Sequence, residues 1–334
     1  MMKSVLLVGS FVFLSSVSFA KDCQEKHGAL DFGSGTTKAF AAIVDVCKKQ
    51  IVEVIYEERL PLALNEALEK SETKEIPSSV VNEALPRFQS LVKKMKDLGV
   101  GKIYAVATSV FRVAKNGSEV AKKISTEIQI PVNVISQERE AELGFWSALA
   151  QKKVSINDPI IVWDIGGGSM QMYARRQGKV HVFQGNLASV TFKNQILEVL
   201  QFKSPKSFSS PNPIGAQREA ALQLAKNHAY LNVPTFFKKE AVKSRWIGVG
   251  GVLSMSVQRQ VNKEAKEFTQ VELDQTLKQR VHLKDSEIDS DYRVSDISNL
   301  ALVLGYMQAL KIPKVETAQA SLGQGLIFYS LHGR

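Results

Sequence analysis

The sequence has few of the residues from which zinc sites are built. Its 334 residues include only two cysteines and five histidines. The histidines lie far apart in the chain, so no zinc-ligand spacing is present. The sequence also contains neither a G-x-x-x-x-G-K-S/T phosphate loop nor a G-x-S-x-G nucleophile elbow. These absences argue against zinc proteins, P-loop nucleotide hydrolases and hydrolases of the elbow type.

Long hydrophobic runs are also scarce, apart from one near the first residue. Lys3 precedes a mostly apolar stretch over residues 5–17, and Ser18-Phe-Ala20 is a small-x-small cleavage pattern. The stretch is too short and too rich in serine for a stable membrane span. We therefore expect residues 1–20 to be a signal peptide. The mature protein, without a membrane span, is expected to be periplasmic or secreted.

Arginine-rich runs are absent as well, although the chain is basic. The formal net charge of +10 favours polyanionic partners such as nucleic acid, polyphosphate or an anionic membrane. The basic residues are scattered and are not interleaved with aromatic residues as in nucleic-acid-binding proteins. We therefore expect no sequence-specific binding of nucleic acid. A soluble basic surface without a polyanionic partner remains the alternative.

Two similar glycine-rich segments stand about one domain length apart. Residues 30–40 align without a gap with residues 163–173, so that Asp31 falls on Asp164 and Thr36 on Ser169. Successive glycines let backbone N–H groups point at one place, which suits a phosphate group. If two related halves face each other, two carboxylates and two glycine turns meet and suit a metal ion with a polyphosphate chain. The alternative is that each glycine turn is only a structural turn.

Strand and helix signals alternate through both halves, which predicts a mixed α/β fold with partly parallel sheets. The length allows two domains, which we place at residues 21–152 and 153–334. The expected strands are residues 28–34, 38–46, 51–58, 102–107, 132–135, 160–164, 170–175, 178–184, 246–250 and one from 315. The expected helices are residues 78–98, 118–128, 138–151, 295–310 and 322–331, with others from about 189, 213, 252 and 272. The last helix is a candidate to pack back on the first domain.

The two cysteines flank the first predicted hairpin. A hairpin centred on Gly35 pairs positions whose numbers sum to 70, and Cys23 and Cys47 have this sum. They would lie opposite each other at the open end of the hairpin, as a disulfide requires. Export to an oxidising compartment would allow the bond to persist. The alternative is two unrelated buried thiols.

Polar residues between the two glycine turns are also candidates for the site. Arg112 and the acidic cluster at residues 138–142 each begin just past a predicted strand, at the edge where Asp31 and Asp164 lie. An arginine there can hold phosphate oxygens by a bidentate contact. A carboxylate in the first turn of a helix can orient and deprotonate a water molecule. The alternative for the cluster is a solvated helix start, which the helix dipole favours.

Four motifs stand in an order and spacing that match a known family. They are Asp31-Phe-Gly-Ser34, residues 107–112 with Asn116, residues 135–141, and residues 164–169. Together they resemble the exopolyphosphatase / guanosine pentaphosphate phosphohydrolase (Ppx/GppA) family of the sugar kinase–Hsp70–actin superfamily. The resemblance covers about residues 28–332, without the extra C-terminal helical domain of longer members.

The resemblance implies two actin-like (ribonuclease H-like) domains with a phosphate-binding cleft between them. It also implies Mg²⁺-dependent hydrolysis of a terminal phosphoanhydride, in polyphosphate or in guanosine pentaphosphate. A homodimer is one of the expected assemblies.

By position, the resemblance gives roles to individual residues. Glu140 matches the catalytic base that activates water, and Arg112 would hold phosphate beside it. Asp31 and Asp164 match the acids near the metal. With the glycines of a third turn added, the predicted phosphate-binding residues are Ser34, Gly35, Gly166, Gly167, Gly168, Ser169, Gly250 and Gly251.

The sequence also departs from the family pattern. Gln171 stands where the family usually has a glutamate, and a neutral amide can neither act as a base nor balance the charge of a metal. Gln137, Gly35, Val252 and the pair at residues 323–324 depart as well. Losing a positioned acid or base typically costs about 10²–10⁴ in rate.

We expect an exported phosphohydrolase that acts on polyphosphate or another phosphoanhydride outside the cytoplasm. The alternative is a catalytically weakened relative that binds a polyanion or a partner protein.

Overall fold

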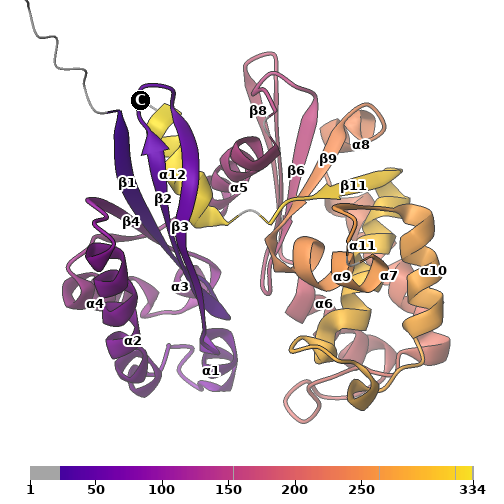
Figure 1. The fold of residues 1–334 in the computed structure, drawn as a ribbon. Coiled ribbons are helices and arrows are strands. Elements are labelled where there is room, and N and C mark those ends of the chain that lie inside the picture. The colour runs from indigo at the N-terminus through magenta and orange to yellow at the C-terminus, as the bar shows by residue number, and fades with distance from the viewer. Residues whose placement is uncertain (1–22, 153, 263, 320, 333–334) are drawn as a thin grey trace, which may run out of the picture.

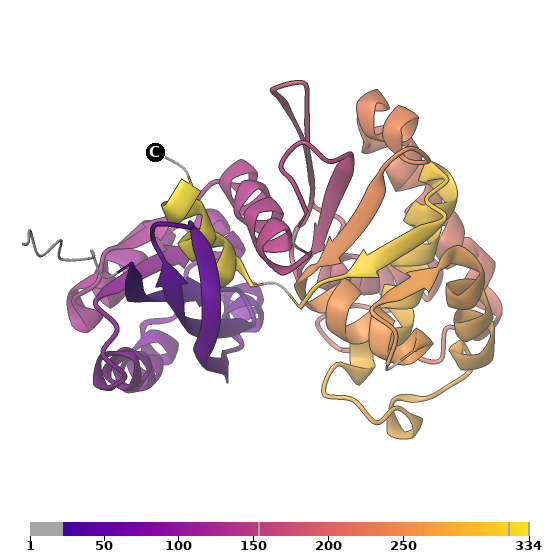
Figure 2. The same ribbon diagram turned by 45° about the horizontal axis from the view of Figure 1, so that its top comes forward.

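The computed structural model describes residues 23–152, 154–262, 264–319 and 321–332. The predicted signal peptide, residues 1–20, lies outside them. The described chain forms two α/β halves, each built on one sheet (Figure 1). Figure 2 shows the same two halves from another side, with helix α12 lying against the first sheet in both views. No helix of the described residues is long and apolar enough to span a membrane.

The first sheet has the order β3-β2-β1-β4-β5. Strands β1 to β3 are antiparallel, whereas β4 and β5 run parallel to β1. The strands are β1 (Gln24–Phe32), β2 (Thr36–Asp45), β3 (Gln50–Pro61), β4 (Lys102–Ala107) and β5 (Val132–Val134). The helices are α1 (Leu64–Lys70), α2 (Ser78–Asp97), α3 (Ser109–Val113) and α4 (Gly117–Ile128).

Strand β1 is buried on both faces, which explains its almost continuous apolar sequence. Leu30 and Phe32 point to the helices, where the Phe32 ring packs edge-to-face on Phe88 of α2 with 4.9 Å between centroids. Ala29, on the other face, belongs to a small cluster with Phe40 and Ile327 of α12. Alternating side chains of one strand therefore fill two different cores.

The second sheet has the order β10-β11-β9-β6-β7-β8. Strands β6 to β8 are antiparallel, and β9 and β11 run parallel to β6. The strands are β6 (Ile160–Ile165), β7 (Met170–Arg176), β8 (Lys179–Gly185), β9 (Arg245–Val249), β10 (Glu267–Thr269) and β11 (Lys314–Thr317). The helices are α6 (Ser189–Gln195), η1 (Ile196–Leu200), η2 (Gly215–Gln217), α7 (Arg218–Asn232), α8 (Thr235–Glu240), η3 (Val252–Val257), α9 (Gln258–Val261), α10 (Gln270–Arg280), η4 (Asp285–Glu287) and α11 (Arg293–Leu310).

Helices α5 (Gln137–Lys152) and α12 (Leu322–His332) lie between the two sheets (Figure 1). They approach so closely that a Cβ on Gly325 would lie 2.0 Å from the carbonyl oxygen of Leu143. The Ser147 hydroxyl of α5 donates to the carbonyl oxygen of Ser321 at 2.9 Å. After β11 the chain thus returns to the first half, where α12 packs on α5 and on the first sheet.

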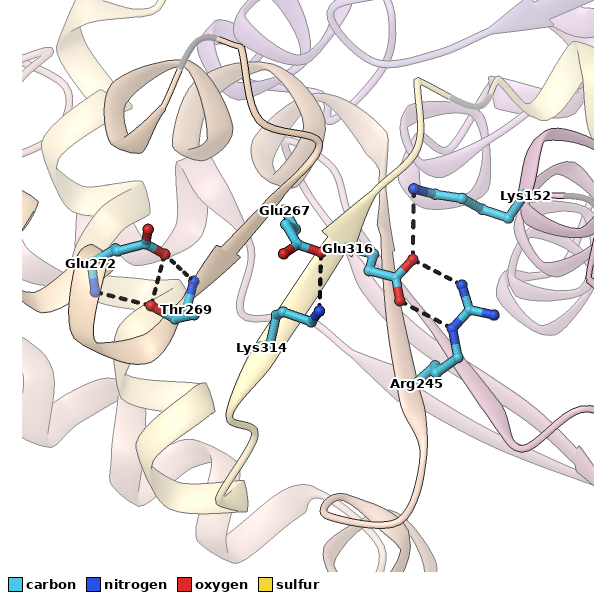
Figure 3. Close-up of polar contacts among 7 residues, drawn as sticks. All are labelled: Lys152, Arg245, Glu267, Thr269, Glu272, Lys314 and Glu316. Carbon is cyan, nitrogen blue, oxygen red and sulfur yellow. Dashed lines mark hydrogen bonds and ion pairs between the residues drawn. The ribbon is translucent and has the colours of Figure 1, made fainter.

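Polar contacts tie the end of α5 to the second sheet (Figure 3). Glu316 of β11 accepts hydrogen bonds of 3.0 and 2.9 Å from Arg245 of β9. Lys152, at the end of α5, places its Nζ atom 3.8 Å from the same carboxylate. Two segments connect the halves: α5, and the chain that follows β11. The Glu316 carboxylate therefore links the end of the first segment to the strand that precedes the second.

Cys23 and Cys47 form a disulfide with a Cα–Cα distance of 5.5 Å. The predicted register of their hairpin is nevertheless wrong by one residue. Paired positions sum to 69, as in Asp31 with Lys38, because the turn spans residues 33–36 and is not centred on Gly35. Val46 therefore lies opposite Cys23 and donates to its carbonyl oxygen at 2.8 Å. Cys47 is the next residue, in the turn that follows β2, and still reaches Cys23.

Candidate active site

The two glycine turns meet between the halves, as the internal repeat predicts. A Cβ on Gly167 would lie 3.6 Å from the Ser34 hydroxyl oxygen of the first turn. A Cβ on Gly168 would lie 3.2 Å from the hydroxyl oxygen of Ser109, at the start of α3. The N-terminus of α6 also joins the second turn, because the Val190 N–H donates to the Gly167 carbonyl at 2.8 Å. The first glycine turn, the second glycine turn, and the starts of α3 and α6 thus lie close together.

The third glycine turn packs directly on Asp164. Gly250 has φ +79°, and a Cβ there would lie 2.1 Å from the Oδ1 atom of Asp164. Only glycine tolerates both this backbone conformation and this approach. Gly251 has open space around it, since no atom lies within 4 Å of its Cβ position. The turn after β9 therefore lies directly against the Asp164 carboxylate.

Glu140 is the acid of the 138–142 cluster that is buried at this site. Its residue is 8% exposed, whereas Glu138 is exposed and Glu142 pairs with Arg139. Helix α5 starts where the Ser136 hydroxyl accepts the Arg139 N–H at 3.1 Å, which puts Glu140 in the first turn. Burial raises the pKa of Glu140 to about 7; Arg112 opposes this shift, and the charges of Asp164 and Asp31 add to it.

Arg112 contacts Glu140 in this structure. Its Nη2 atom lies 2.8 Å from the Glu140 Oε2 atom, and its Nη1 atom donates to the Ile135 carbonyl at 3.0 Å. The guanidinium group thus joins α3, the end of β5 and the start of α5. Asn116, the other residue of this motif, makes paired hydrogen bonds of 2.9 Å with the backbone of Ile76 and so has a structural position.

Asp31 and Asp164 occupy equivalent positions in the two hairpins. Asp31 is 3% exposed, and its Oδ1 atom is buried without a hydrogen-bond partner among the described residues. Burial raises the pKa of both carboxyl groups, that of Asp164 to about 6, and the charge of Lys38 opposes both shifts.

Lys38 is a member of the site that sequence reasoning missed. Its Nζ atom lies 3.7 Å from the Asp31 Oδ2 atom. The signal that could have identified it is the internal repeat, in which Lys38 aligns with Gln171.

Gln171 lies opposite Asp164 across the second hairpin and is 1% exposed. Its side-chain N–H donates to the Ser169 hydroxyl oxygen at 2.9 Å, so the two side chains share one face of β7. Gln137 at the start of α5 donates to the backbone carbonyls of Met170 and Gly185 at 3.2 and 3.1 Å. Gln137 therefore holds the backbone beside the second glycine turn, and Gln171 holds the Ser169 side chain.

The acids of the site fit a magnesium ion that is held partly by its substrate. Within the described residues, Cys23, Asp45 and Cys47 are the only three His, Cys, Asp or Glu residues whose ligand atoms lie within 4.8 Å of one another. These cysteines are joined to each other, and the acids between the halves form no such protein-only cage. Mg²⁺ usually takes one or two carboxylates and completes its shell with water and substrate phosphates. The unpartnered Asp31 Oδ1 atom and the neighbouring Asp164 meet that requirement.

One family model matches most of the chain. The family model of the Ppx/GppA phosphatase family matches residues 42–333, so the first glycine turn lies outside the match. A relative is the bifunctional 3-dehydroquinate synthase/phosphatase of Fusobacterium nucleatum, with 26% identity over 168 residues. Those residues are 49% of this chain and only 25% of that protein.

Solved structures show the same fold. The chain is similar to the Aquifex aeolicus member of the Ppx/GppA family, with a TM-score of 0.71 and 17% identity over 92% of this chain and 98% of that chain. It is equally similar to an exopolyphosphatase from Cytophaga hutchinsonii, with a TM-score of 0.71, 18% identity, and 92% and 98% coverage. The predicted fold class, an α/β protein with two actin-like halves, is confirmed.

Proposed function

Because the chain belongs to the Ppx/GppA phosphatase family, we propose that it is a Mg²⁺-dependent phosphohydrolase. Its substrate is polyphosphate or a related phosphoanhydride, from which it removes the terminal phosphate outside the cytoplasm. The observation that carries this proposal is Glu140, a buried carboxylate with a raised pKa beside two glycine turns and two aspartates. Such a group has the basicity that proton abstraction near neutral pH requires.

The glycine turns and the neighbouring hydroxyl groups bind the phosphate chain in this proposal. Backbone N–H groups of Gly167 and Gly168 donate to phosphate oxygens, as do the hydroxyl groups of Ser34 and Ser169. The Ser169 hydroxyl accepts a hydrogen bond from Gln171, so its own proton is free to point at a phosphate oxygen. Donors from both halves thus hold the terminal phosphate in one orientation, which is the main task of a protein in phosphoryl transfer.

Asp31 and Asp164 would hold the magnesium ion, which neutralises charge on the phosphate oxygens when it is bound. Glu140 accepts the proton of the attacking water. Arg112 fixes the Glu140 carboxylate through the 2.8 Å ion pair and limits how far its pKa rises. Its planar guanidinium group also presents further N–H donors to a phosphate oxygen. The released orthophosphate and the shortened chain leave between the same two turns.

The disulfide supports the exported location. A bond between Cys23 and Cys47 persists only where thiols are not kept reduced, as in the periplasm or outside the cell. This agrees with the signal peptide that the sequence predicts. Polyphosphate is then the more suitable substrate, because guanosine pentaphosphate is a cytoplasmic signal.

A second candidate function is a polyanion-binding protein with weak catalysis. The observation that favours it is the buried amide of Gln171 beside Asp164, where the family usually has a glutamate. At this position the candidate keeps a hydrogen-bonding amide and lacks one negative charge beside the metal.

Phosphate release tests the proposal and separates the two candidates. The mature protein is incubated with long-chain polyphosphate and Mg²⁺, with and without a chelator, and orthophosphate is followed in time. We expect release that stops when the chelator is added. Binding of the polyphosphate without release would favour the second candidate, and neither binding nor release would contradict both.

A further inference from the structure

Lys38 occupies a position that is repeated in the two halves of the site. In the first hairpin it lies across from Asp31, and in the second hairpin Gln171 lies across from Asp164 in the same way. The two positions also coincide when residues 30–40 are aligned with residues 163–173. The hairpin partner of each aspartate is therefore a cation in the first half and a neutral amide in the second.

The two cations near the aspartates, Arg112 and Lys38, are each already in contact with an acid. Arg112 is engaged by Glu140 and by the Ile135 carbonyl. Lys38 has its Nζ atom 3.7 Å from Asp31, and its charge also acts on Asp164. When Glu140 and both aspartates are ionised, Lys38 and Arg112 leave one negative charge in excess. Lys38 is thus the counter-ion of the aspartate pair.

The contact between Lys38 and Asp31 is loose enough to be exchanged. Its 3.7 Å separation exceeds the roughly 2.7–2.9 Å of a direct charge-assisted hydrogen bond. The Lys38 side chain is 28% exposed, so its ammonium group can turn toward solvent on a flexible four-carbon stem. The carboxylate itself is buried, and its second oxygen has no partner among the described residues. The unpartnered Oδ1 atom of Asp31 can therefore bind a second cation, and the cation that Asp31 now contacts, Lys38, can move away.

We propose that the Lys38 ammonium group is the resident counter-ion of Asp31 and Asp164, and that a divalent cation must displace it to bind there. Lys38 then lowers the affinity of the site for Mg²⁺, because both cations compete for the same carboxylates. Once displaced, its charge lies beside the terminal phosphate and attracts it. Lys38 is therefore a positioning residue. It weakens the binding of the metal ion and strengthens the binding of the phosphate anion. This inference rests on the proposed use of Asp31 and Asp164 as metal ligands.

The test is a direct measurement of Mg²⁺ binding, by calorimetry on the mature protein without substrate. The variants are Lys38→Met, which removes the charge, and Lys38→Arg, which keeps it. The control is Lys48→Met, which removes an ion pair of nearly the same length, 3.8 Å to Asp45, at the far end of the same hairpin. Lys38→Gln is a second neutral variant, and thermal unfolding of all four verifies that they are folded.

We expect Lys38→Met and Lys38→Gln to bind Mg²⁺ at least about tenfold more tightly than the native protein, since a like charge near the ion has been removed. Lys38→Arg and Lys48→Met should stay close to native affinity. Unchanged or weaker binding in the folded neutral variants would overturn the proposal, and so would a lack of measurable binding in every protein. Phosphate release from polyphosphate, measured in parallel, decides the proposed function separately.

Discussion

Ionising the buried Glu140 carboxyl group costs free energy, so its contribution to the stability of the folded protein depends on pH. Burial raises its pKa from 4.5 to about 7, so between these pH values the folded protein binds more protons than the unfolded chain. The contribution of Glu140 to the free energy of unfolding therefore falls as the pH rises through this window. Below about pH 4.5 both states are protonated, and the penalty vanishes.

Glu140→Gln removes this penalty while its amide oxygen can still lie against the Arg112 guanidinium group. We expect the variant to be more stable than the native protein at about pH 8, by on the order of 2–3 kcal/mol, and almost equally stable at about pH 5. Thermal unfolding at the two pH values, without added metal, measures the difference. A variant that is less stable at the higher pH would contradict the buried position and raised pKa of Glu140.

Gln171 is a neutral residue at a position where the family resemblance implies a glutamate. It lies beside Asp164 and bonds to the Ser169 hydroxyl. We predict that Gln171→Glu increases phosphate release at saturating Mg²⁺, because the added charge tightens the metal and polarises the attacking water. Without Mg²⁺ the same variant should have a lower melting temperature, since it adds a buried charge beside two carboxylates.

Gln171→Asn is a matched control, because it keeps the amide and adds no charge. If Gln171→Glu releases no more phosphate than the native protein, the missing acid is not what limits catalysis. If the native protein is already fast, the glutamine is a tolerated variation.

At the scale of elements, the first hairpin shows both what the sequence reveals and what it hides. Its two strands follow from apolar runs that end at the glycine turn, and the cysteine pair follows from their spacing. The register does not, because it depends on how many residues the turn uses. The predicted sum of 70 pairs Asp31 with Ala39, whereas the observed register pairs it with Lys38. The one-residue error therefore concealed Lys38.

The same limit applies to the other elements. Strand β4 was predicted with its observed ends, Lys102–Ala107, because a continuous apolar-rich run is bounded there by glycine and threonine. Strand β10 and helix α8 were not expected, since segments of three and six residues are too short to show a period. The Arg112–Glu140 pair joins two helices far apart in the chain, and only the tertiary structure brings its partners together. Motifs thus predict candidate members of the site, and packing decides which of them are in contact.

The disulfide closes the first hairpin at the end away from the site. Cys23 and Cys47 are 24 positions apart, and a bond across such a loop typically stabilises a protein by about 3 kcal/mol. We expect a reducing agent to lower the melting temperature of the native protein. A Cys23→Ser/Cys47→Ser variant should melt at that lower temperature with or without the agent. Two free thiols in the exported protein, found by mass spectrometry, would refute the bond.

Helices α5 and α12 meet where Gly325 touches the Leu143 carbonyl. A Cβ at this position would lie 2.0 Å from that oxygen, so Gly325→Ala must push the helices apart. We predict a clear loss of thermal stability. Gly101→Ala is the control, because no atom lies within 4 Å of its Cβ position. If both alanine variants melt at the same temperature, the close contact between the helices does not stabilise the protein.

At the scale of the whole molecule, the site exists only where the two halves meet. Asp31, Ser34 and Lys38 come from the first sheet, and Asp164, Gly167 and Gly168 come from the second. Glu140 lies on α5, one of the two segments that join the halves (Figure 1). Ser34 and Gly167 nearly touch, so we expect the halves to move apart to admit a phosphate chain.

The central claim, that this arrangement hydrolyses a phosphoanhydride with Glu140 as the base, is tested most directly by one comparison. Orthophosphate release from long-chain polyphosphate is measured for the native protein and for Glu140→Gln at saturating Mg²⁺, together with polyphosphate binding. We predict that the native protein releases phosphate and that the variant is slower by about 10²-fold or more while it binds equally well. Equal rates of release in the two proteins would contradict the claim.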